Sequence, residues 1–540
     1  MMELCDKYIH ELIQFDPTMN DYLKIDKYSH LRSKCPNFMS KEYNKEEKKI
    51  NRKYLNLLKN KKNKTFYDEL FYEDLKEYFQ TMYFQDKYFP FSYLSNFLTD
   101  TLEEISSVDT DYEFSDEKSY EDYICRLNQT KEIYNSMIQN LKEGIKKEMT
   151  ISKRIVNGII EQLKDALEEK TMKNKFKHYR KIPPKIKNKF LEAIQGNIIS
   201  HIKKLIRFLT DEYLDHCRDS IGLCGLKNGT RLYRDIVKSY SFKDYTPEYL
   251  HELGFKEMNR NLKDLAELKK KMKIKGDYTK FINHMKNVPS SKIKDKKKVL
   301  QTLKDLQTRL IEEVFDKNFN EKLTTKDLYN IRCVSRENKH MSAYYLLPDF
   351  NNQRVGTFYI NALDPSLINK YELPVLTLHE GIPGHHYQTN FHMKESKPIY
   401  YRLSDYTSYI EGWGLYCEGL LEPKNNYEHF WQIIYNLHRS IRLIIDTGIH
   451  AFDWSYEKCF QFMQQYLPHS DEEIKNEIYR YTCDPGQALS YKVGELSLLK
   501  LREKYLKKYK DDYKGFHGLV FKIGPLPLKL FEKRFNEYLK

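Results

Sequence analysis

The spacing of apolar residues predicts helices along most of this chain. Apolar side chains recur at every fourth position, which places them on one face of a helix. One series is Ile155, Ile159, Leu163 and Leu167, and another is Ile194, Ile198, Ile202 and Ile206. Thr246-Pro247 has the form of an N-cap and first-turn proline before a helix to about Met272, and residues 470–473 form a capping-box pattern. We therefore expect a mainly α fold.

One region departs from the helical pattern. Residues 344–347 and 355–360 are rich in β-branched and aromatic side chains, and the turn-forming segment 348–352 separates them. This arrangement predicts a small β-hairpin shortly before the histidine-rich stretch described below. An edge strand there could pair with an extended peptide, or the hairpin could serve packing alone. The sequence favours neither alternative.

The composition is that of a folded protein. Of the 540 residues, 40% are hydrophobic, 14% are aromatic and 31% are charged. The net charge is +14, but lysines are dispersed along the chain with acidic residues between them, so we expect no nucleic-acid partner. No apolar run reaches the length of a membrane span, and the N-terminus lacks the pattern of a secretory signal. We therefore expect no membrane partner.

The cysteines point to a reducing compartment. There are nine of them, they are dispersed along the chain, and none forms a Cys-x-x-Cys pair. This pattern argues against a disulfide framework and against a structural zinc knuckle. The location that we expect is therefore cytoplasmic.

The most informative stretch is residues 379–386, with the sequence His-Glu-Gly-Ile-Pro-Gly-His-His. A zinc hydrolase needs imidazoles and a carboxylate to hold the metal, and a nearby carboxylate to accept a proton from water. The common zincin signature is His-Glu-x-x-His, whose histidines lie one helical turn apart. Here Pro383 stands where the second histidine would fall. Alternatively, a lone histidine after the apolar segment 374–378 is simply a buried core residue.

The spacing within this stretch requires a break in the helix. His379 and His386 are seven residues apart and share a helical face, but a rise of about 1.5 Å per residue separates them by roughly 10 Å. Zinc–nitrogen bonds of about 2.0–2.1 Å cannot bridge that gap. Pro383 and Gly384 suit a local bulge, which would return His385 to the position of the second ligand. We rank His385 above His386 as this ligand.

Two acidic residues lie on a second predicted helix. Glu411 follows His386 by 25 residues, and Glu418 lies two turns further on the same face, with Gly414 between them. Glu411 is a candidate third metal ligand, and Glu418 is a candidate carboxylate that orients a ligand histidine. The alternative is an ordinary helix with solvated acids, although the neighbouring Trp413 argues against full exposure.

Charged residues also occur within an apolar segment further along the chain, and such charges need partners. They are Arg439, Arg442, Asp446 and His450. They form either an internal ion-pair set, which we favour, or contacts for a substrate carboxylate. Beyond them, Tyr491 is a candidate hydrogen-bond donor to a tetrahedral oxyanion.

Together these blocks resemble the domain-of-unknown-function 885 (DUF 885) family, which is related by motif to zinc peptidases. The matching segments are 354–359 with Asn361, 378–386 with Gln388, 411–413 with Tyr416, Arg442 with 446–450, and 485–488 with Tyr491 and Gly494. Weaker similarity between Gly229 and Met258 extends the resemblance over most of the chain.

The resemblance implies a two-lobed helical fold with a deep channel, similar to the thimet oligopeptidase and carboxypeptidase Taq families. We expect an N-terminal helical lobe at residues 1–335 and a catalytic lobe at 336–540, with the small hairpin or sheet beside the metal helix. In those families a ligand glutamate follows the motif His-Glu-x-Gly-His. This chain carries two extra residues inside that motif.

We therefore expect a zinc-dependent hydrolase that cleaves peptide or amide bonds of short peptides. Zinc would be held by His379, His385 and Glu411. Glu380 would act as general base and proton shuttle, and Tyr491 would stabilise the oxyanion. The candidates for contacts to substrate or to the ligands are Tyr359, His386, Glu418, Arg442 and His450. The alternatives are a metal-dependent amidohydrolase that acts on a modified amino acid or small metabolite, and a helical binding protein without turnover.

The cysteine pattern predicts that a reductant does not change the stability of the protein. Without structural disulfides, the midpoint of thermal unfolding should be the same in the presence and absence of dithiothreitol. Circular dichroism at increasing temperature measures this midpoint. A large decrease on reduction would show that disulfides stabilise the fold.

Overall fold

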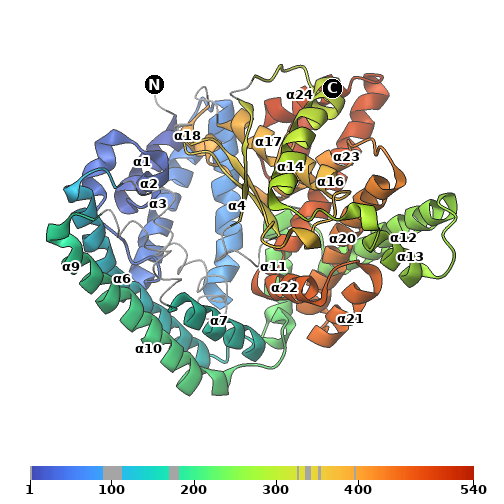
Figure 1. The fold of residues 1–540 in the computed structure, drawn as a ribbon. Coiled ribbons are helices and arrows are strands. Elements are labelled where there is room, and N and C mark those ends of the chain that lie inside the picture. Colours follow the sequence, from blue (N-terminus) through green and yellow to red (C-terminus); the bar gives the residue numbers. More distant parts are fainter. Residues whose placement is uncertain are drawn as a thin grey trace. The chain divides into compact units, whose positions relative to one another are not determined.

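The computed structural model describes residues 3–88, 112, 114–168, 182–241, 243–324, 327–334, 342–350, 354–393 and 397–540 (Figure 1). Most of these residues are helical, and the strands among them form one small sheet. The prediction of a mainly α fold is therefore confirmed. Within the same ranges, none of the helices combines the length and the apolar character that crossing a membrane requires.

The chain divides into two compact units. Unit 1 comprises Met1–Leu232, Asp349–Asn351 and Pro398–Tyr400, and unit 2 comprises Tyr233–Pro348, Asn352–Lys397 and Tyr401–Lys540. The lobes that we expect at residues 1–335 and 336–540 follow from the resemblance, and they stay a prediction. The histidine-rich stretch and the acidic residues after it all belong to unit 2.

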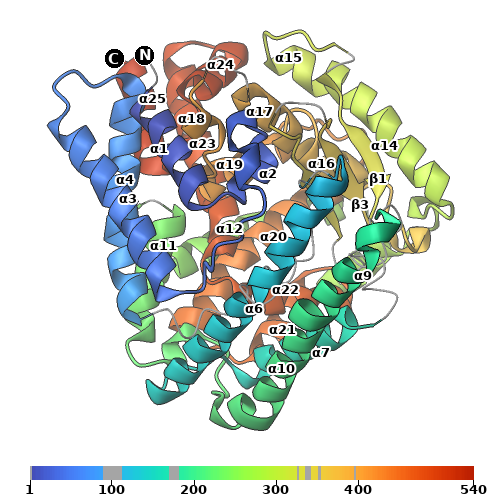
Figure 2. The ribbon, with the colours of Figure 1, turned by 90° about the vertical axis from the view of Figure 1, so that its left-hand side faces the viewer.

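Unit 1 is built from helices. They are α1 (Leu4–Phe15), α2 (Met19–Leu23), α3 (Lys41–Asn60), α4 (Phe66–Tyr88), α6 (Glu117–Lys146), α7 (Lys153–Ala166), α9 (Pro184–Ala193) and α10 (Ser200–Phe208). Both predicted apolar series follow helices. The first lies in α7 except for Leu167, which caps the end of that helix, and the second lies in α10 and the π-helical turns Ile194–Ile199 before it. Helices α6 and α10 lie side by side (Figures 1 and 2).

Unit 2 contains the remaining helices. They are α12 (Pro247–Lys271), α13 (Tyr278–Lys286), α14 (Lys296–Leu310), α15 (Asp316–Asn318), α16 (Leu373–Glu380), α17 (His385–His392), α19 (Thr407–Glu418), α20 (Asn426–Ala451), α21 (Tyr456–Tyr466), α22 (Asp471–Cys483), α23 (Ser490–Lys508), α24 (Tyr513–Ile523) and α25 (Leu528–Tyr538). Helices α11 (Gly229–Ser241) and α18 (Ile399–Arg402) cross the division between the units. The predicted caps are present, since Thr246 accepts a hydrogen bond from the Tyr249 amide and Ser470 forms a capping box with Glu473.

The packing of helices in unit 2 positions the site. Helix α20 is deeply buried, with every residue from 437 to 450 shielded from solvent. Helices α19 and α23 cross where Gly412 meets Gly494, and a Cβ atom on Gly494 would lie 2.0 Å from the carbonyl oxygen of Ser408. This close crossing sets Tyr491, at the start of α23, beside the helix that carries Glu411.

The sheet has three strands in the order β1-β3-β2. Strand β3 (Thr357–Ile360) pairs antiparallel with β2 (Ala343–Leu346), as the predicted hairpin requires. It also pairs in parallel with β1 (Asn330–Cys333), a strand that the sequence did not predict. Helix α14 contacts β1 (Figure 2). Part of the predicted linker, residues 351–353, lies outside the described residues.

Candidate metal centre

The histidine-rich stretch breaks between two helices, as its spacing predicts. Helix α16 ends at Glu380 and α17 begins at His385. A Cβ atom on Gly384 would lie 2.0 Å from the carbonyl oxygen of His379 and 2.2 Å from that of Leu378. Only glycine permits so close an approach to the last turn of α16. The return of the chain brings the imidazole of His385 next to that of His379, with 4.6 Å between the ring centres.

Helix α19 holds the break in place and supplies the third member of the group. The indole Nε1 of Trp413 donates a hydrogen bond of 2.8 Å to the carbonyl oxygen of Pro383. Two positions earlier, Glu411 directs Oε2 to within 3.4 Å of His379 Nε2 and 3.5 Å of His385 Nε2. One ligand atom from each of the three residues lies within 4.8 Å of the others.

These separations fit a tetrahedral metal better than they fit hydrogen bonds. An ordinary hydrogen bond between nitrogen and oxygen is about 2.9 Å long. Ligands about 2.0–2.1 Å from a tetrahedral zinc lie about 3.3–3.4 Å apart. Glu411 Oε2 is buried and makes no hydrogen bond within the described residues. The donor set, two imidazoles and one carboxylate, is one that zinc prefers, and the group therefore fits a zinc ion.

Glu418 orients His379 from the opposite side of its ring. Its Oε1 lies 2.8 Å from His379 Nδ1, so this nitrogen donates and Nε2 is left facing Glu411. The guanidinium of Arg439, on α20, in turn lies 3.0 Å from the same Oε1. A carboxylate in this position fixes the tautomer of a ligand histidine and raises its basicity. The predicted contact between Glu418 and His379 is thus present.

Opposite charges buried together set the proton affinities of the group. Burial alone would lower the pKa of His379, but Glu411 and Glu418 raise it to about 9. Burial alone would raise the pKa of Glu411, but His379 and His385 hold it well below its ordinary value. A metal that binds here must therefore displace a proton from His379, and its affinity falls as the pH is lowered.

Glu380 is close to this group without being part of it. Its carboxylate is not among the converging ligand atoms, and the residue is only 8% exposed. Burial raises the pKa of the carboxyl group, against the opposing charges of His385 and His379. A carboxylate of raised pKa beside a metal is suited to accept a proton at neutral pH.

His386 has a separate role in the structure. Its Nε2 donates to the carbonyl oxygen of Asp327 at 2.7 Å, and its Nδ1 therefore accepts from the Tyr345 hydroxyl at 2.8 Å. Burial lowers the pKa of His386 to about 4, so the ring is neutral. Because both ring nitrogens have partners, neither faces the ligand group. The contact with Tyr345 joins α17 to strand β2.

Tyr491 lies next to the candidate ligands. The centre of its ring is 6.3 Å from that of His379, and the guanidinium of Arg442 covers the ring at 4.4 Å. Burial raises the pKa of the Tyr491 hydroxyl, which keeps it protonated and able to donate. The position is compatible with the predicted donor role.

Two of the four charged residues singled out on α20 form ion pairs with carboxylates of other helices. Arg439 pairs with Glu418, and Arg442 pairs with Glu477 of α22 at 3.1 Å. Asp446 accepts from the amide of Gly486 at 3.1 Å. His450 is fully buried, and its Nε2 lies 2.9 Å from the carbonyl oxygen of Tyr481. Tyr359 stacks on Tyr344, with 4.9 Å between the ring centres.

Two contributors were not found from the sequence. Glu477 supplies the carboxylate for Arg442, and the only sequence signal was that arginines in an apolar segment require such a partner. Gly414 was placed on the same helical face as Glu411, but its function was not predicted. A Cβ atom at Gly414 would lie 2.7 Å from Cε1 of His379, so this glycine provides the space for the imidazole.

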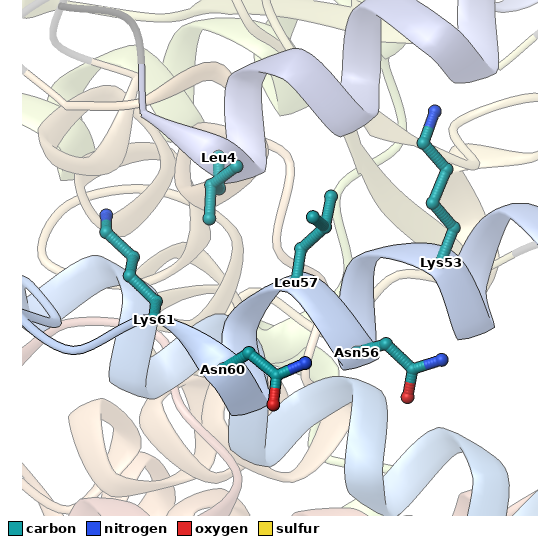
Figure 3. A pocket seen from close by; sticks show the side chains of 6 residues that line it. All are labelled: Leu4, Lys53, Asn56, Leu57, Asn60 and Lys61. Atoms are coloured by element: carbon teal, nitrogen blue, oxygen red, sulfur yellow. The ribbon is translucent and has the colours of Figure 1, made fainter.

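A hollow on the surface of unit 1 is a different kind of site. It has a volume of about 550 Å³, and Figure 3 shows the side chains that line it. They are Leu4, Lys53, Asn56, Leu57, Asn60 and Lys61. Both lysines already form ion pairs, Lys53 with Glu11 and Lys61 with Asp68. The lining includes no histidine, cysteine or acid, so it lacks the groups for metal or acid–base chemistry.

Comparisons with known proteins bear on the family and the fold. The model of the family described as "Bacterial protein of unknown function (DUF885)" matches residues 17–535. No curated protein matches the chain. The structure is similar to "the putative lipoprotein from Colwellia psychrerythraea", with a TM-score of 0.87 and 21% identity over 99% of this chain and 98% of that one. It is also similar to "a putative lipoprotein of unknown function from Shewanella oneidensis", with a TM-score of 0.79 and 17% identity over 98% of each chain. At these identities the likeness concerns the fold alone.

The two adjacent histidines make a matched pair for testing the ligand set. We expect His385→Ala to lose most of its bound zinc, because Nε2 of His385 faces Glu411. His386→Ala should retain zinc close to the wild-type content, because both ring nitrogens of His386 form hydrogen bonds with residues outside the ligand group. Elemental analysis of both purified variants measures this difference. Equal retention, or the reverse order, would contradict the assignment.

The space beside His379 gives a second test. We expect Gly414→Ala to weaken zinc binding about 10- to 100-fold, because the added methyl group displaces a ring that must stay oriented. Gly518→Ala is the control, since a Cβ atom there meets nothing within 4 Å and alanine favours the helix by about 0.5–1 kcal/mol. Competition with a fluorescent zinc chelator measures both affinities. Wild-type affinity in Gly414→Ala would show that the contact does not constrain His379.

Proposed function

The chain belongs to the DUF885 family of bacterial proteins of unknown function, and we propose that it is a zinc-dependent hydrolase that cleaves peptide or amide bonds of short peptides. One observation carries the proposal. His379, His385 and Glu411 direct one ligand atom each toward a common point, and the buried Glu380 lies beside this group without joining it. Ligands and base are thus separate residues, as a metal-dependent hydrolase requires.

Zinc held by His379, His385 and Glu411 would polarise the substrate carbonyl and make an attacking water more acidic. The position of Glu411 Oε2 supports this assignment, because this buried oxygen makes no hydrogen bond within the described residues and lies 3.4 Å and 3.5 Å from the two imidazole nitrogens, as ligands of one shared cation would. Glu418 holds His379 in the tautomer whose Nε2 faces the group. Arg439 holds Glu418 and compensates its buried charge.

The remaining steps are assigned to side chains around the ligands. Glu380 accepts a proton from the attacking water and then delivers it to the leaving amine. Its raised pKa favours both transfers near neutral pH. Tyr491 donates a hydrogen bond to the oxygen that becomes negative in the tetrahedral intermediate. Arg442, which lies over the Tyr491 ring, limits the movement of that side chain.

The substrate range that we propose follows from the resemblance to zinc peptidases. A two-lobed architecture with lobes at 1–335 and 336–540 and a deep channel would admit short peptides and exclude folded proteins. Strand β2 lies at an edge of the sheet, and an extended peptide could pair with it. The contact between Tyr345 of β2 and His386 of α17 favours this use of the edge, because it couples the strand to the segment that carries His385.

We also propose a cytoplasmic location, with neither a nucleic-acid nor a membrane partner. The nine cysteines are dispersed along the chain and form no Cys-x-x-Cys pair, which suits a reducing compartment. The two similar structures are described as putative lipoproteins. A lipid-anchored location is therefore the alternative, and fractionation of cells that express the full-length protein distinguishes the two.

The roles of the two glutamates can be separated by isosteric substitutions. We expect Glu380→Gln to keep zinc near one equivalent per chain while turnover falls roughly 10²–10⁴-fold, the usual effect of losing a general base. Glu411→Gln should instead lose zinc, because it removes a charged ligand. A peptide library read by mass spectrometry, together with elemental analysis, provides both measurements.

The outcomes of this experiment also distinguish the alternatives. Loss of zinc in Glu380→Gln and its retention in Glu411→Gln would reverse the two roles. Full activity of Glu380→Gln would contradict the proposed water activation. Cleavage of small N-acyl amino acids without cleavage of any peptide would favour an amidohydrolase. A zinc-free protein that takes up no zinc would favour a helical binding protein.

A further inference from the structure

We propose that the substrate carries a free carboxylate one or two residues beyond the bond that is cut, and that Arg442 binds this carboxylate. The inference rests on the proposed hydrolase function and specifies its substrate class. Two sources share this chemistry: the C-terminal carboxylate of a peptide and the side chain of an acidic residue. The geometry around Arg442 carries the inference.

Two of the three guanidinium nitrogens of Arg442 form hydrogen bonds within the described residues. Its Nε donates to the Tyr481 hydroxyl at 3.1 Å and its Nη2 donates to Glu477 Oε2 at 3.1 Å. Its Nη1 is buried and makes no hydrogen bond within the described residues. A buried, unpaired N–H group of a charged side chain is costly, and a carboxylate is the partner that satisfies it best.

Neighbouring arginines do not offer the same terminal group. Arg439 also has a buried nitrogen without a hydrogen bond, its Nε, but both of its terminal nitrogens have partners: Nη1 donates to the carbonyl oxygen of Tyr435 and Nη2 pairs with Glu418. Arg480 donates from Nη1 to Gln487 and from Nη2 to Glu477, and its side chain is 35% exposed. Of these three arginines, Arg442 is thus the one that combines an unpaired terminal nitrogen with a side chain that is only 9% exposed.

The local charge also favours an anion. Within the part of the chain that the structure describes, arginines 439, 442 and 480 form ion pairs with two carboxylates, those of Glu418 and Glu477. These five side chains therefore hold one positive charge in excess, in a region where low exposure strengthens electrostatic attraction. Burial alone would lower the pKa of Arg442, but the Glu477 carboxylate raises it, so the guanidinium stays charged.

The position of Arg442 relative to the candidate metal ligands sets the distance between the carboxylate and the scissile bond. The ring of Tyr491 lies 6.3 Å from the ring of His379 and 4.4 Å from the guanidinium carbon of Arg442. One extended residue spans about 3.3–3.6 Å. The two distances keep the guanidinium within about 11 Å of the His379 ring, and two extended residues with a hydrogen bond of about 2.9 Å span about 10 Å. A substrate whose scissile carbonyl lies at the ligand group can therefore place a carboxylate at Arg442 with its next one or two residues.

The test compares three forms of the same peptides with zinc-loaded protein. N-acetylated tetrapeptides are prepared with a free C-terminal carboxylate, with a C-terminal amide, and as the amide with glutamate at one of the last two positions. We expect the free acids to be cleaved with a kcat/KM about 10- to 100-fold above that of the plain amides, the effect of one charge-assisted contact. A rate for the glutamate amides as high as that for the free acids would assign the contact to an acidic side chain instead of the terminus.

Substitutions at two arginines show which of them binds the substrate carboxylate. In Arg442→Met the ratio of free-acid to amide rates should fall toward one, and Arg442→Lys should recover part of it. Arg480→Gln is the matched control, because Arg480 shares Glu477 but has no buried unpaired nitrogen to offer, and it should keep the ratio. Equal wild-type rates for acids and amides, or an unchanged ratio in Arg442→Met, would overturn the inference.

A binding measurement keeps this inference separate from the proposed hydrolysis. Calorimetry of zinc-loaded Glu380→Gln with an N-acetyl dipeptide and its amide should show about 10- to 100-fold tighter binding of the acid, lost in Arg442→Met. Such binding without cleavage of any peptide by the wild type would refute the hydrolase and leave the carboxylate site intact. Equal binding of acid and amide would refute the carboxylate site.

Discussion

The candidate metal centre depends on the contact of Gly384 with the last turn of α16. The carbonyl oxygens of Leu378 and His379 lie so close to this glycine that any side chain would collide with them. This contact lets a motif with two extra residues present two imidazoles to one carboxylate. Without it, the rise of the helix would carry His385 away from His379. The hydrogen bond from Trp413 to Pro383 joins the break to α19, the helix that supplies Glu411.

Around this contact, buried charges are arranged in pairs that fix the orientation of each functional side chain. Glu418 fixes His379, Arg439 fixes Glu418, and Arg442 fixes the ring of Tyr491. Each of these charges would be costly to bury alone, and pairing offsets the cost. Helix α20 supplies both arginines from a fully buried segment. Through these contacts helix α20 positions His379 and the predicted oxyanion donor.

Local features of the fold could be predicted from the sequence, and features set by distant contacts could not. Helix periodicity and caps are properties of neighbouring residues, and α7, α12 and the cap at Ser470 follow the prediction. The break at residues 381–384 was predictable because proline restricts the backbone and interrupts a helix, whereas glycine permits unusual backbone angles. Strand β1 was not, because its parallel partner lies more than twenty residues away. For the same reason, the sequence did not predict the pairing of Glu477 with Arg442 or the contact of Gly414 with His379. Both depend on how separate helices pack.

We propose that the break brings His385, and not His386, to a metal held also by His379 and Glu411. Diffraction data collected at the zinc absorption edge from crystals of the zinc-loaded protein locate the metal. An anomalous peak is expected about 2.0–2.1 Å from Nε2 of His379 and of His385, and within bonding distance of Glu411. A peak bonded to His386, or no peak at this group in protein that has taken up zinc, would refute this ligand set.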